Sequence, residues 1–413
     1  MTKAMGAIPQ GFEADADCML LIGGVRADAL VARAGGTPLF AYDAGMVGQR
    51  IARFRAAFPT VDLHYAVKAN PYAPLLKFIH SKVDGLDVAS AGELRLAVDT
   101  GADPGTISFA GPGKRVEELG LAIGLGVTIN LESEGEAERA LAAAARAGAT
   151  PRVAVRVNPD FELRGSSMRM GGGARPFGVD AERVPALVRR LLEAGADWRG
   201  FHIFAGSQAL DPAAIAEAQA AGIALAARLA EAAGAPPPAV NLGGGFGVPY
   251  VHGERPLDVE AVGDRLRSAL NSIPQILADT RFMIELGRWL VAEAGVYLAR
   301  IVDRKVSHGR TFLITDGGMH HQLAASGNFG QVVRRNFPAA IASRFGAAPQ
   351  EDATIVGCLC TPLDILADDV SLPRAEAGDL VAIFLAGAYG LSASPQAFLG
   401  HPPAFETLVN EPG

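Results

Sequence analysis

The segment HYAVKANP, residues 64–71, carries a lysine at the point where an extended run stops. Alternation with a period of two puts His64, Ala66 and Lys68 on one face of a strand, opposite an apolar face. The Asn-Pro pair that follows terminates strands, so Lys68 is predicted to be the last residue of its strand. Such an amine is either a solvated surface charge or a nucleophile that bonds to carbonyl carbons.

Two further segments carry residues that are suited to chemistry. NLGGGFG, residues 241–247, has three consecutive glycines whose backbone N–H groups can approach and bind an anion such as phosphate. ELGR, residues 285–288, places a glutamate directly after an apolar run. Because a glycine run is also typical of a flexible turn, its meaning depends on the elements around it.

Short β-type runs alternate with Ala/Leu-rich amphipathic segments over the first two thirds of the chain. The runs cover residues 61–67, 85–89, 106–110, 127–131, 152–157, 200–205, 239–243 and 281–285. Alternation of this kind predicts a parallel (β/α)8 barrel, an α/β fold whose active site lies at the carboxyl ends of the strands. Lys68 then ends the first strand, the glycine run follows the seventh, and Glu285 ends the eighth.

After residue 290 the pattern changes to β-type runs with few helical segments between them. This change predicts a second, mostly antiparallel β domain at residues 290–413. The strand-like CMLLIGGV, residues 18–25, is expected to pair with that sheet. We therefore expect an N-terminal segment at residues 1–37 that joins the β domain, and a barrel at residues 38–289.

Composition excludes several classes of function. The 413 residues carry a net charge of −7 and no long basic run, which argues against nucleic acid and anionic membranes as partners. The three cysteines are too few for a disulfide framework, and no Cys/His spacing is typical of zinc, so we expect no metal and a reducing, cytoplasmic location. Apolar runs are interrupted by charges, Gly or Pro, so we expect no membrane-spanning helix.

The predicted barrel brings an amine, a phosphate-binding glycine run and a carboxylate to one mouth. Pyridoxal 5'-phosphate (PLP) needs these three groups. The amine bonds to its aldehyde, the glycine run holds its phosphate, and the carboxylate pairs with its pyridine nitrogen.

The sequence resembles the PLP-dependent amino-acid decarboxylases of the diaminopimelate and ornithine decarboxylase family, which have an alanine-racemase-like fold. The resemblance covers nearly the whole chain. Its motifs, in family order, are HYAVKAN, GLDVASAGEL, RVNPD, GFHIFAGSQ, NLGGGFG, ELGR, GCLCTPLD and GAYG. It implies PLP as the cofactor, a carboxy-lyase activity, and a homodimer in which the partner's β domain completes each active site.

The resemblance also implies roles for individual residues. Lys68 matches the lysine that bonds to PLP, and Glu285 matches the carboxylate that keeps the pyridine nitrogen protonated, which strengthens the ring as an electron sink. The other implied cofactor-binding residues are Phe204, Ser207, Gly243, Gly244, Gly245, Arg288, Tyr389, Asp87, Arg156 and His202. Arg288 is also expected to contact the substrate. Phe204 replaces a histidine that stacks on the cofactor in relatives, and the role of His202, polar or structural, stays open.

GCLCTPLD, residues 357–364, matches a family segment in which a cysteine precedes an aspartate by four residues. The resemblance implies that Cys360 protonates the carbanion after CO₂ leaves, at the active site of the opposite subunit. The alternative is a small core residue, which is the reading we give Cys358. Asp364 is either an acid on the substrate side or a loop residue.

The region that should bind the far end of the substrate departs from the family. Diaminopimelate decarboxylases carry an arginine and a tyrosine in the segment that matches residues 316–338, and a glutamate after the cysteine. This chain has Ala324 and Ala325 near the arginine position, and Thr361 after the cysteine. A charged distal group would lack partners, so free meso-diaminopimelate is not the expected substrate. His320 and His321, with Thr361, are expected to line the distal pocket.

HHQLAASGNFGQ and the SMRMGGGARPFG loop at residues 167–178 resemble a subgroup that acts on modified or carrier-protein-bound amino acids. One such activity decarboxylates a glutamyl group on an acyl-carrier protein, and similar enzymes accompany exopolysaccharide and secondary-metabolite gene clusters. Arg164, Arg169 and Arg175 could contact a carrier's phosphopantetheine phosphate. The alternative is a solvated insertion.

Three other functions are weighed against this one. The first is a diaminopimelate decarboxylase that makes L-lysine. The second is an amino-acid racemase on the same fold, although alanine-type racemases carry arginine at the pyridine nitrogen, where this chain has Glu285. The third is a PLP-binding protein without catalysis, although small proteins of that kind lack a β domain.

Overall fold

The computed structural model describes residues 2–163, 165, 168–169, 171–328 and 334–411. The chain folds into two compact units. The barrel unit comprises Ile51–Gly247 and Pro256–Gly287, and the β unit comprises Met1–Arg50, Val248–Arg255 and Arg288–Gly413. The barrel is therefore inserted into a β unit that is built from both ends of the chain.

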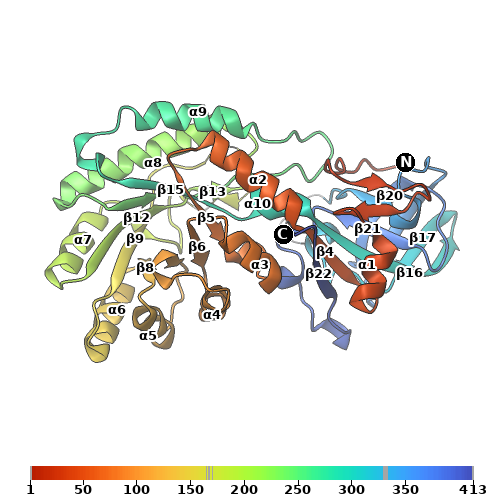
Figure 1. Cartoon of the computed structure of the whole chain (residues 1–413), viewed down its shortest axis with the longest axis horizontal. Helices are drawn as coiled ribbons and strands as arrows, with labels where there is room; N and C mark the ends of the chain where they lie inside the picture. Colours follow the sequence, from red (N-terminus) through yellow and green to blue (C-terminus); the bar gives the residue numbers. More distant parts are fainter. Residues whose placement is uncertain (1, 164, 166–167, 170, 329–333, 412–413) are drawn as a thin grey trace. The chain divides into compact units, whose positions relative to one another are not determined.

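Eight parallel strands form a closed barrel, which confirms the predicted fold class (Figure 1). The strands are β5 (Asp62–Ala66), β6 (Gly85–Val88), β7 (Ile107–Phe109), β8 (Thr128–Leu131), β9 (Arg152–Asn158), β12 (Asp197–Ile203), β14 (Ala239–Asn241) and β15 (Arg281–Leu286). Neighbours in this order pair, and the pairing of β15 with β5 closes the ring. All eight predicted runs are thus strands, and closure leaves none of them with a free edge.

Helices connect the strands and cover the barrel (Figure 1). They are α2 (Ala44–Ala57), α3 (Ala73–His80), α4 (Ala91–Asp99), α5 (Val116–Leu125), α6 (Glu134–Ala147), α7 (Val184–Glu193), α8 (Pro212–Ala233) and α9 (Val259–Leu270). Helix α6 shows how the sequence sets their ends. The Ser133 side chain accepts a hydrogen bond from the Glu136 amide at the start, and Gly148, with φ of 62°, ends the helix in the left-handed region.

Helix α8 is long and apolar enough to cross a membrane by length and composition alone. It packs between α7 and α9 as a barrel helix, and 56% of its most apolar stretch is buried. The apolar side chains of α8 are therefore explained by their burial against the rest of the barrel unit.

The β unit is built on one mixed sheet of eight strands. They are β4 (Leu39–Asp43), β16 (Gly295–Ser307), β17 (Arg310–Thr315), β18 (Ala339–Ile341), β19 (Glu351–Val356), β20 (Ile365–Leu372), β21 (Leu380–Phe384) and β22 (Phe405–Val409). Most pairs are antiparallel, as expected, but β17 pairs with β19 and β22 pairs with β4 in parallel. Helices α1 (Ala27–Ala34) and α10 (Arg288–Val291) complete the unit.

The N-terminal segment differs from its prediction. Residues 18–25 do not pair with the large sheet; β2 (Leu20–Ile22) instead pairs with β1 (Glu13–Ala14) and β3 (Val25–Arg26) in a small sheet. The apolar Leu20 and Ile22 pack into the core of the large sheet, which explains the strand-like pattern. The N-terminal strand that joins the large sheet is β4, so the β unit extends past the boundary expected at residue 37.

Lys68 also lies slightly outside its predicted element. Strand β5 ends at Ala66, and Lys68 is the middle residue of a single 3-10 turn, Val67–Ala69. His64, two residues from the end of β5, is buried and contacts Asp87 of β6, so the predicted polar face of this strand faces other barrel strands.

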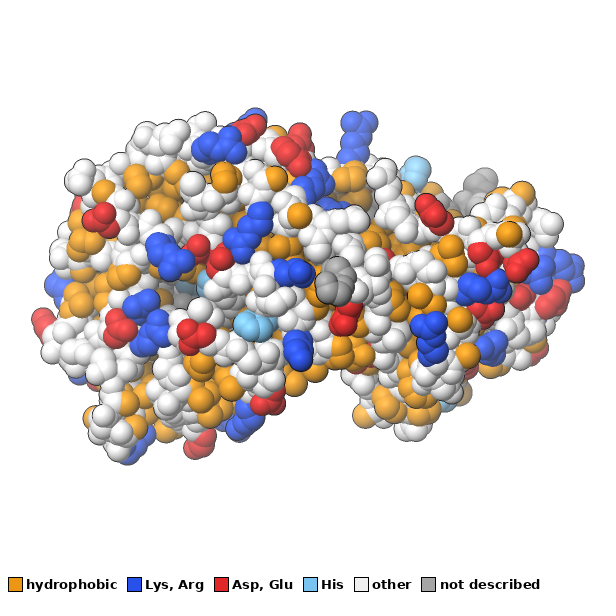
Figure 2. Space-filling view, viewed as in Figure 1, with side chains coloured by type: hydrophobic (Ala, Val, Ile, Leu, Met, Phe, Trp, Pro, Cys, Tyr) orange, Lys and Arg blue, Asp and Glu red, His pale blue; other side chains and the backbone are white. Residues whose placement is uncertain are grey.

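Charged side chains of both signs are interspersed on the face of the molecule shown in Figure 2. Many form exposed pairs, such as Arg190 with Glu138 of helix α6. Exposed pairs of this kind contribute about 0–1 kcal/mol each to stability, because water screens them.

A buried ion pair inside the barrel unit contrasts with those surface pairs. The Lys114 Nζ lies 2.6 Å from Glu136 Oε1, and both side chains are 1% exposed. The same amine donates to the carbonyl oxygens of Gly111 and Asn130, so all three of its protons have acceptors. Burial lowers the pKa of Lys114, although Glu136 opposes this shift.

We expect Glu136→Ala to lower the free energy of unfolding by about 3–5 kcal/mol, because it leaves the Lys114 ammonium buried without its counter-charge. Glu138→Ala, on the exposed face of the same helix, is the matched control and should cost less than about 1 kcal/mol. Urea denaturation of the two variants measures both. If both variants lost the same free energy of unfolding, the buried pair would contribute no more to stability than the exposed pair.

Candidate active site

Lys68 and Glu285 meet at the carboxyl ends of the barrel strands. Strand β15 pairs with β5 in parallel, with Glu285 opposite His64, so the residues that follow β5 emerge beside Glu285. The Lys68 Nζ lies 3.5 Å from Glu285 Oε1. The Lys68 side chain is 45% exposed and that of Glu285 is 6% exposed, so the amine lies at the open mouth and the carboxylate lies deeper.

The carboxylate of Glu285 is held in its charged form. Burial by itself raises the pKa of Glu285, but the charge of Lys68 and a hydrogen bond from His202 outweigh burial and bring this pKa well below its usual value. The His202 Nε2 lies 3.1 Å from Glu285 Oε2, and Arg156 adds a weaker attraction. His202 therefore has the polar role that the sequence left open.

The three glycines follow β14 at the same end of the barrel. A Cβ at Gly244 would collide with the backbone carbonyl of Glu285, so only glycine fits this position. The Asn241 side chain accepts a hydrogen bond from the Gly243 amide at 2.8 Å. In the part of the chain that the structure describes, the amides of Gly244 and Gly245 have no acceptor, so they can donate to an anion.

Phe204 and Ser207 lie in the segment that follows β12. The Ala209 amide donates to the carbonyl of Gly245 at 2.9 Å, so this segment runs beside the glycines. The Phe204 ring centroid lies 5.6 Å from Lys68 Nζ, which places an aromatic ring next to the amine. Such a ring can pack against a planar heterocycle.

Asp87 and Arg156 lie in polar networks inside the barrel. Asp87 Oδ1 lies 3.3 Å from His64 Nδ1, whereas its Oδ2 is buried without a partner among the described residues. Arg156 Nη1 donates to Glu132 Oε1 at 2.9 Å. Both residues contact other barrel side chains, and their direct contact with a cofactor remains a prediction.

Glu132 is a residue of this network that the sequence analysis missed. Its carboxylate also accepts hydrogen bonds from the amides of Gly111 and Gly178, and Arg156 and Lys114 lower its pKa against the effect of burial. The available signal was its position: Glu132 directly follows strand β8, just as the active-site segments follow other barrel strands.

The residues at this mouth fit PLP. Lys68 offers an amine, Gly244 and Gly245 offer backbone donors that have no acceptor among the described residues, and Glu285 offers a buried carboxylate that stays ionised. These groups would respectively bond to the aldehyde, hold the phosphate and pair with the pyridine nitrogen.

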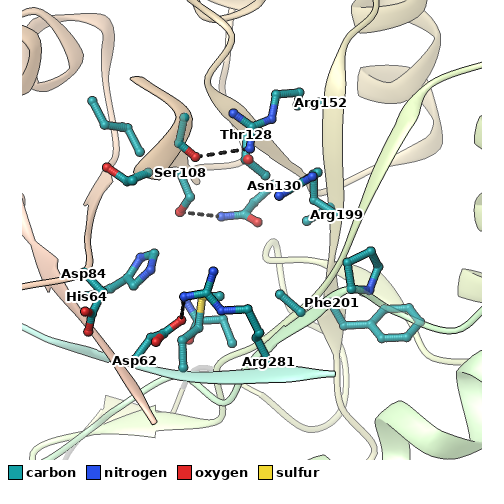
Figure 3. A pocket seen from close by; sticks show the side chains of 18 residues that line it. Asp62, His64, Asp84, Ser108, Thr128, Asn130, Arg152, Arg199, Phe201 and Arg281 are labelled. Carbon is teal, nitrogen blue, oxygen red and sulfur yellow. Dashed lines mark hydrogen bonds and ion pairs between the residues drawn. The ribbon is translucent and has the colours of Figure 1, made fainter. Parts of the chain in front are cut away.

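A second opening lies at the other end of the barrel, where Figure 3 looks into a cavity of about 220 Å³. Its lining includes Asp62, Arg152 and Arg281, which start strands β5, β9 and β15. Arg281 pairs with Asp62, as the dashed line shows. Because barrel enzymes carry their chemistry at the carboxyl ends of the strands, this opening is not the candidate active site.

In the β unit, Arg288 contacts two tyrosines. Its guanidinium lies 4.7 Å from the ring centroid of Tyr389 and donates to the Tyr250 hydroxyl at 2.9 Å. Tyr389 has φ of 52°, a strained conformation that clusters at functional sites. Tyr250, which the sequence analysis missed, thus holds Arg288, and the cofactor roles of Arg288 and Tyr389 remain predictions.

Cys360 and Thr361 lie on a turn after β19. Cys360 is exposed, which disfavours the alternative of a core residue. Asp364, by contrast, is 2% exposed, and its two oxygens accept hydrogen bonds from the amides of Met319 (2.6 Å) and Leu359 (2.8 Å). These bonds favour the loop role over a direct contact with substrate.

The two histidines predicted to line a distal pocket are both buried. His321 lies between the Tyr297 hydroxyl (3.2 Å) and the Pro402 carbonyl (3.0 Å), so both its nitrogens are engaged. Neither nitrogen of His320 has a partner among the described residues. The neighbouring Gln322, which we did not predict, is also fully buried with an unpartnered side-chain amide in the described part of the chain.

Part of the loop proposed to contact a carrier lies outside the described residues. This applies to Arg164 and, in the distal segment, to residues 329–333. Only the backbone of Arg169 is described, in the short strand β10 (Met168–Arg169), which pairs with β13 (Gly206–Ser207). Arg175 lies 3.6 Å from Glu162.

Comparisons with known proteins agree with this geometry. The family described as "Pyridoxal-dependent decarboxylase, pyridoxal binding domain" matches residues 44–292. The chain is 38% identical to the L-glutamyl-[BtrI acyl-carrier protein] decarboxylase of Niallia circulans over 90% of its own length and 88% of that protein. It is 34% identical to a diaminopimelate decarboxylase of Actinosynnema pretiosum subsp. auranticum, over 93% and 86%.

Solved structures agree as well. The diaminopimelate decarboxylase of M. jannaschii in complex with L-lysine superposes with a TM-score of 0.87 at 25% identity, over 97% of this chain and 93% of that one. The site geometry, the family match and these relatives lead to one conclusion: the chain belongs to the pyridoxal-dependent decarboxylases and is a PLP-dependent carboxy-lyase with the alanine-racemase-like fold.

Proposed function

We propose that this decarboxylase acts on a glutamyl-type amino acid that is attached to an acyl-carrier protein. The observation that carries the proposal is the higher identity to an enzyme named for that substrate than to the diaminopimelate decarboxylases that also match. An amino acid held by its carrier needs fewer charged contacts at its far end than a free diamino acid.

The distal segment supports this choice. Ala324 and Ala325, near the position of the family's arginine, lie in a short 3-10 helix (Ala324–Ser326), and Thr361 follows the cysteine. None of these three side chains carries a charge, so none can form an ion pair with a charged distal group, and an unpaired buried charge is costly. The same segment disfavours the alternative function, that of a diaminopimelate decarboxylase. The fold does not separate the two functions, because a diaminopimelate decarboxylase in complex with L-lysine has the same fold.

PLP, when bound, supplies an electron sink for the electron pair that stays at Cα as CO₂ leaves. Lys68 is the amine that would hold the aldehyde of the cofactor. Glu285, kept ionised by Lys68 and His202, holds a proton at the pyridine nitrogen. The amides of Gly244 and Gly245 anchor the phosphate. An arginine at the position of Glu285 would favour racemisation, so this carboxylate supports decarboxylation.

Cys360 is the proposed donor of the proton that replaces CO₂ at Cα. It is exposed on the β unit, as a residue that serves the active site of a partner subunit must be. This role requires a homodimer, which we propose as the functional form. All three cysteines are free, which supports a reducing, cytoplasmic location.

The loop at residues 167–178 is the proposed contact for the carrier. Arg175 is partly exposed and lies near Glu162 at 3.6 Å, a separation that gives only a weak pair. Its guanidinium is thus able to reach a phosphopantetheine phosphate.

Lys68→Ala should abolish the covalent attachment of PLP, because among the described residues no other lysine amine pairs with Glu285. Absorption spectra of the protein titrated with PLP, before and after borohydride reduction, measure this attachment. Lys77→Ala, an exposed lysine of helix α3, is the control and should behave as wild type. Unchanged labelling of the Lys68 variant would remove the basis for the cofactor site.

Glu285→Gln should lower kcat by about 100-fold or more while PLP stays bound, because a neutral amide cannot hold the proton at the pyridine nitrogen. CO₂ release gives kcat, and the spectrum confirms the bound cofactor. Glu138→Gln controls for the loss of one carboxylate elsewhere in the barrel unit. An active Glu285 variant would contradict the proposed role.

The PLP-loaded protein should release CO₂ from glutamyl-acyl-carrier protein with a kcat/KM about 100-fold or more above that for free glutamate or meso-diaminopimelate. Mass spectrometry of the carrier and CO₂ trapping measure the two products. The Lys68→Ala protein gives the background. Formation of L-lysine from free meso-diaminopimelate at a comparable rate would favour the alternative enzyme, and inversion at Cα without CO₂ would favour a racemase.

A further inference from the structure

The β unit contains a cluster of potential metal ligands that the proposed chemistry does not use. His320, Cys358 and His401 each offer one ligand atom, and these three atoms lie within 4.8 Å of one another. The Cys358 Sγ lies 3.8 Å from His401 Nδ1. The three residues are far apart in the sequence, so they do not form a short Cys/His motif from which a metal site could be predicted.

The topology of the sheet brings the first two ligands together. Strands β17 and β19 are parallel neighbours, with Ile314 opposite Val356, so the segments after them leave the sheet at the same edge. The Asp364 carboxylate then ties these segments to each other by accepting hydrogen bonds from the amides of Met319 and Leu359. Because Met319 precedes His320 and Leu359 follows Cys358, this carboxylate fixes the backbone of both ligands.

The third ligand is fixed in a similar way. The Nε2 of His321 donates to the carbonyl of Pro402, next to His401. Its Nδ1 accepts a hydrogen bond from the Tyr297 hydroxyl. With both nitrogens engaged, His321 cannot itself bind a metal. It instead holds the C-terminal segment that carries His401 against the segment that carries His320.

His320 is the observation that points to a ligand. Its side chain is fully buried, and in the described part of the chain neither ring nitrogen has a hydrogen-bond partner. A buried polar group without a partner costs about 1–3 kcal/mol, so such groups normally have one. The neutral form of such a buried imidazole has the free lone pair that a metal requires.

We propose that His320, Cys358 and His401 form a binding site for Zn²⁺. Two imidazoles and one thiolate are ligands that Zn²⁺ prefers, whereas Mg²⁺ and Ca²⁺ prefer oxygen. Tetrahedral Zn²⁺ with ordinary bond lengths separates a sulfur ligand from a nitrogen ligand by about 3.6 Å, close to the separation of Cys358 and His401. Both of these side chains are partly exposed, so a water molecule can supply the fourth ligand.

Zn²⁺ binding replaces the thiol proton of Cys358, which passes to solvent as the Zn–S bond forms. The carboxylates of Asp364 and Asp316 lie near enough to act electrostatically on the Cys358 thiol. The same carboxylates attract a dication, which stabilises the thiolate in turn. The bound ion joins the segments after β17 and β19 to the segment before β22, so it should stabilise the fold of the β unit.

The holoprotein, depleted with a chelator, refilled with ZnCl₂ and separated from excess metal, tests the site by elemental analysis. We expect about one Zn²⁺ per chain in the wild type. Cys358→Ser and His401→Asn should weaken binding by more than about 100-fold, because losing a ligand costs more than losing a partner of a ligand. Cys18→Ser and Cys360→Ser, which remove thiols outside the cluster, are the matched controls and should bind as wild type.

Two measurements keep folding separate from binding. Zn²⁺ should raise the melting temperature of the wild type and the control variants but not that of Cys358→Ser or His401→Asn. In Co²⁺-loaded protein, a visible band typical of tetrahedral thiolate coordination should be absent from Cys358→Ser, with Zn²⁺-loaded protein subtracted to cancel the PLP absorbance. A folded wild type that retains no Zn²⁺, or ligand variants that bind as wild type, would overturn the proposal and leave a packed His/Cys cluster.

Discussion

The active site depends on a carboxylate that is buried and yet charged. Glu285 lies below the barrel mouth, where burial favours its neutral form, and it stays ionised because Lys68, His202 and Arg156 surround it with positive charge and a hydrogen bond. These three partners come from segments around β5, β12 and β9. The closed barrel of parallel strands brings those ends to one point, so the charge of Glu285 depends on the fold.

The same segment of β15 also packs against the glycines that we propose to hold the phosphate. Its backbone carbonyl at Glu285 packs so closely on Gly244 that no side chain is tolerated there. In the described part of the chain, the amides of Gly244 and Gly245 have no acceptor. A polar group without a partner is costly in a folded protein unless a ligand supplies one. The glycines and the carboxylate therefore form a single preorganised site, fixed by the packing of β14 against β15.

Two lysine–glutamate pairs in the barrel unit differ in burial, and this difference distinguishes a structural pair from one that can bind a ligand. Lys114 and Glu136 are both fully buried, and every proton of the amine has an acceptor, so this pair has no capacity left for a ligand. Lys68 is partly exposed, with its partner beneath it, so its amine is accessible from the mouth. In the β unit, Asp364 resembles Glu285 in burial, but its two oxygens accept hydrogen bonds from backbone amides, so it positions segments instead.

The period of the elements and the positions of reactive residues along them could be predicted from the sequence alone. Alternation of strands and helices indicated the barrel, and the motifs around Lys68, Glu285 and the glycines indicated PLP, because these properties depend on residues close together in the chain. The tertiary structure decided what depends on distant segments: the pairing of β2, the bond between His202 and Glu285, the loop role of Asp364, and the meeting of His320, Cys358 and His401. Burial and hydrogen bonding arise between segments that the chain brings together only on folding, so no local pattern encodes them.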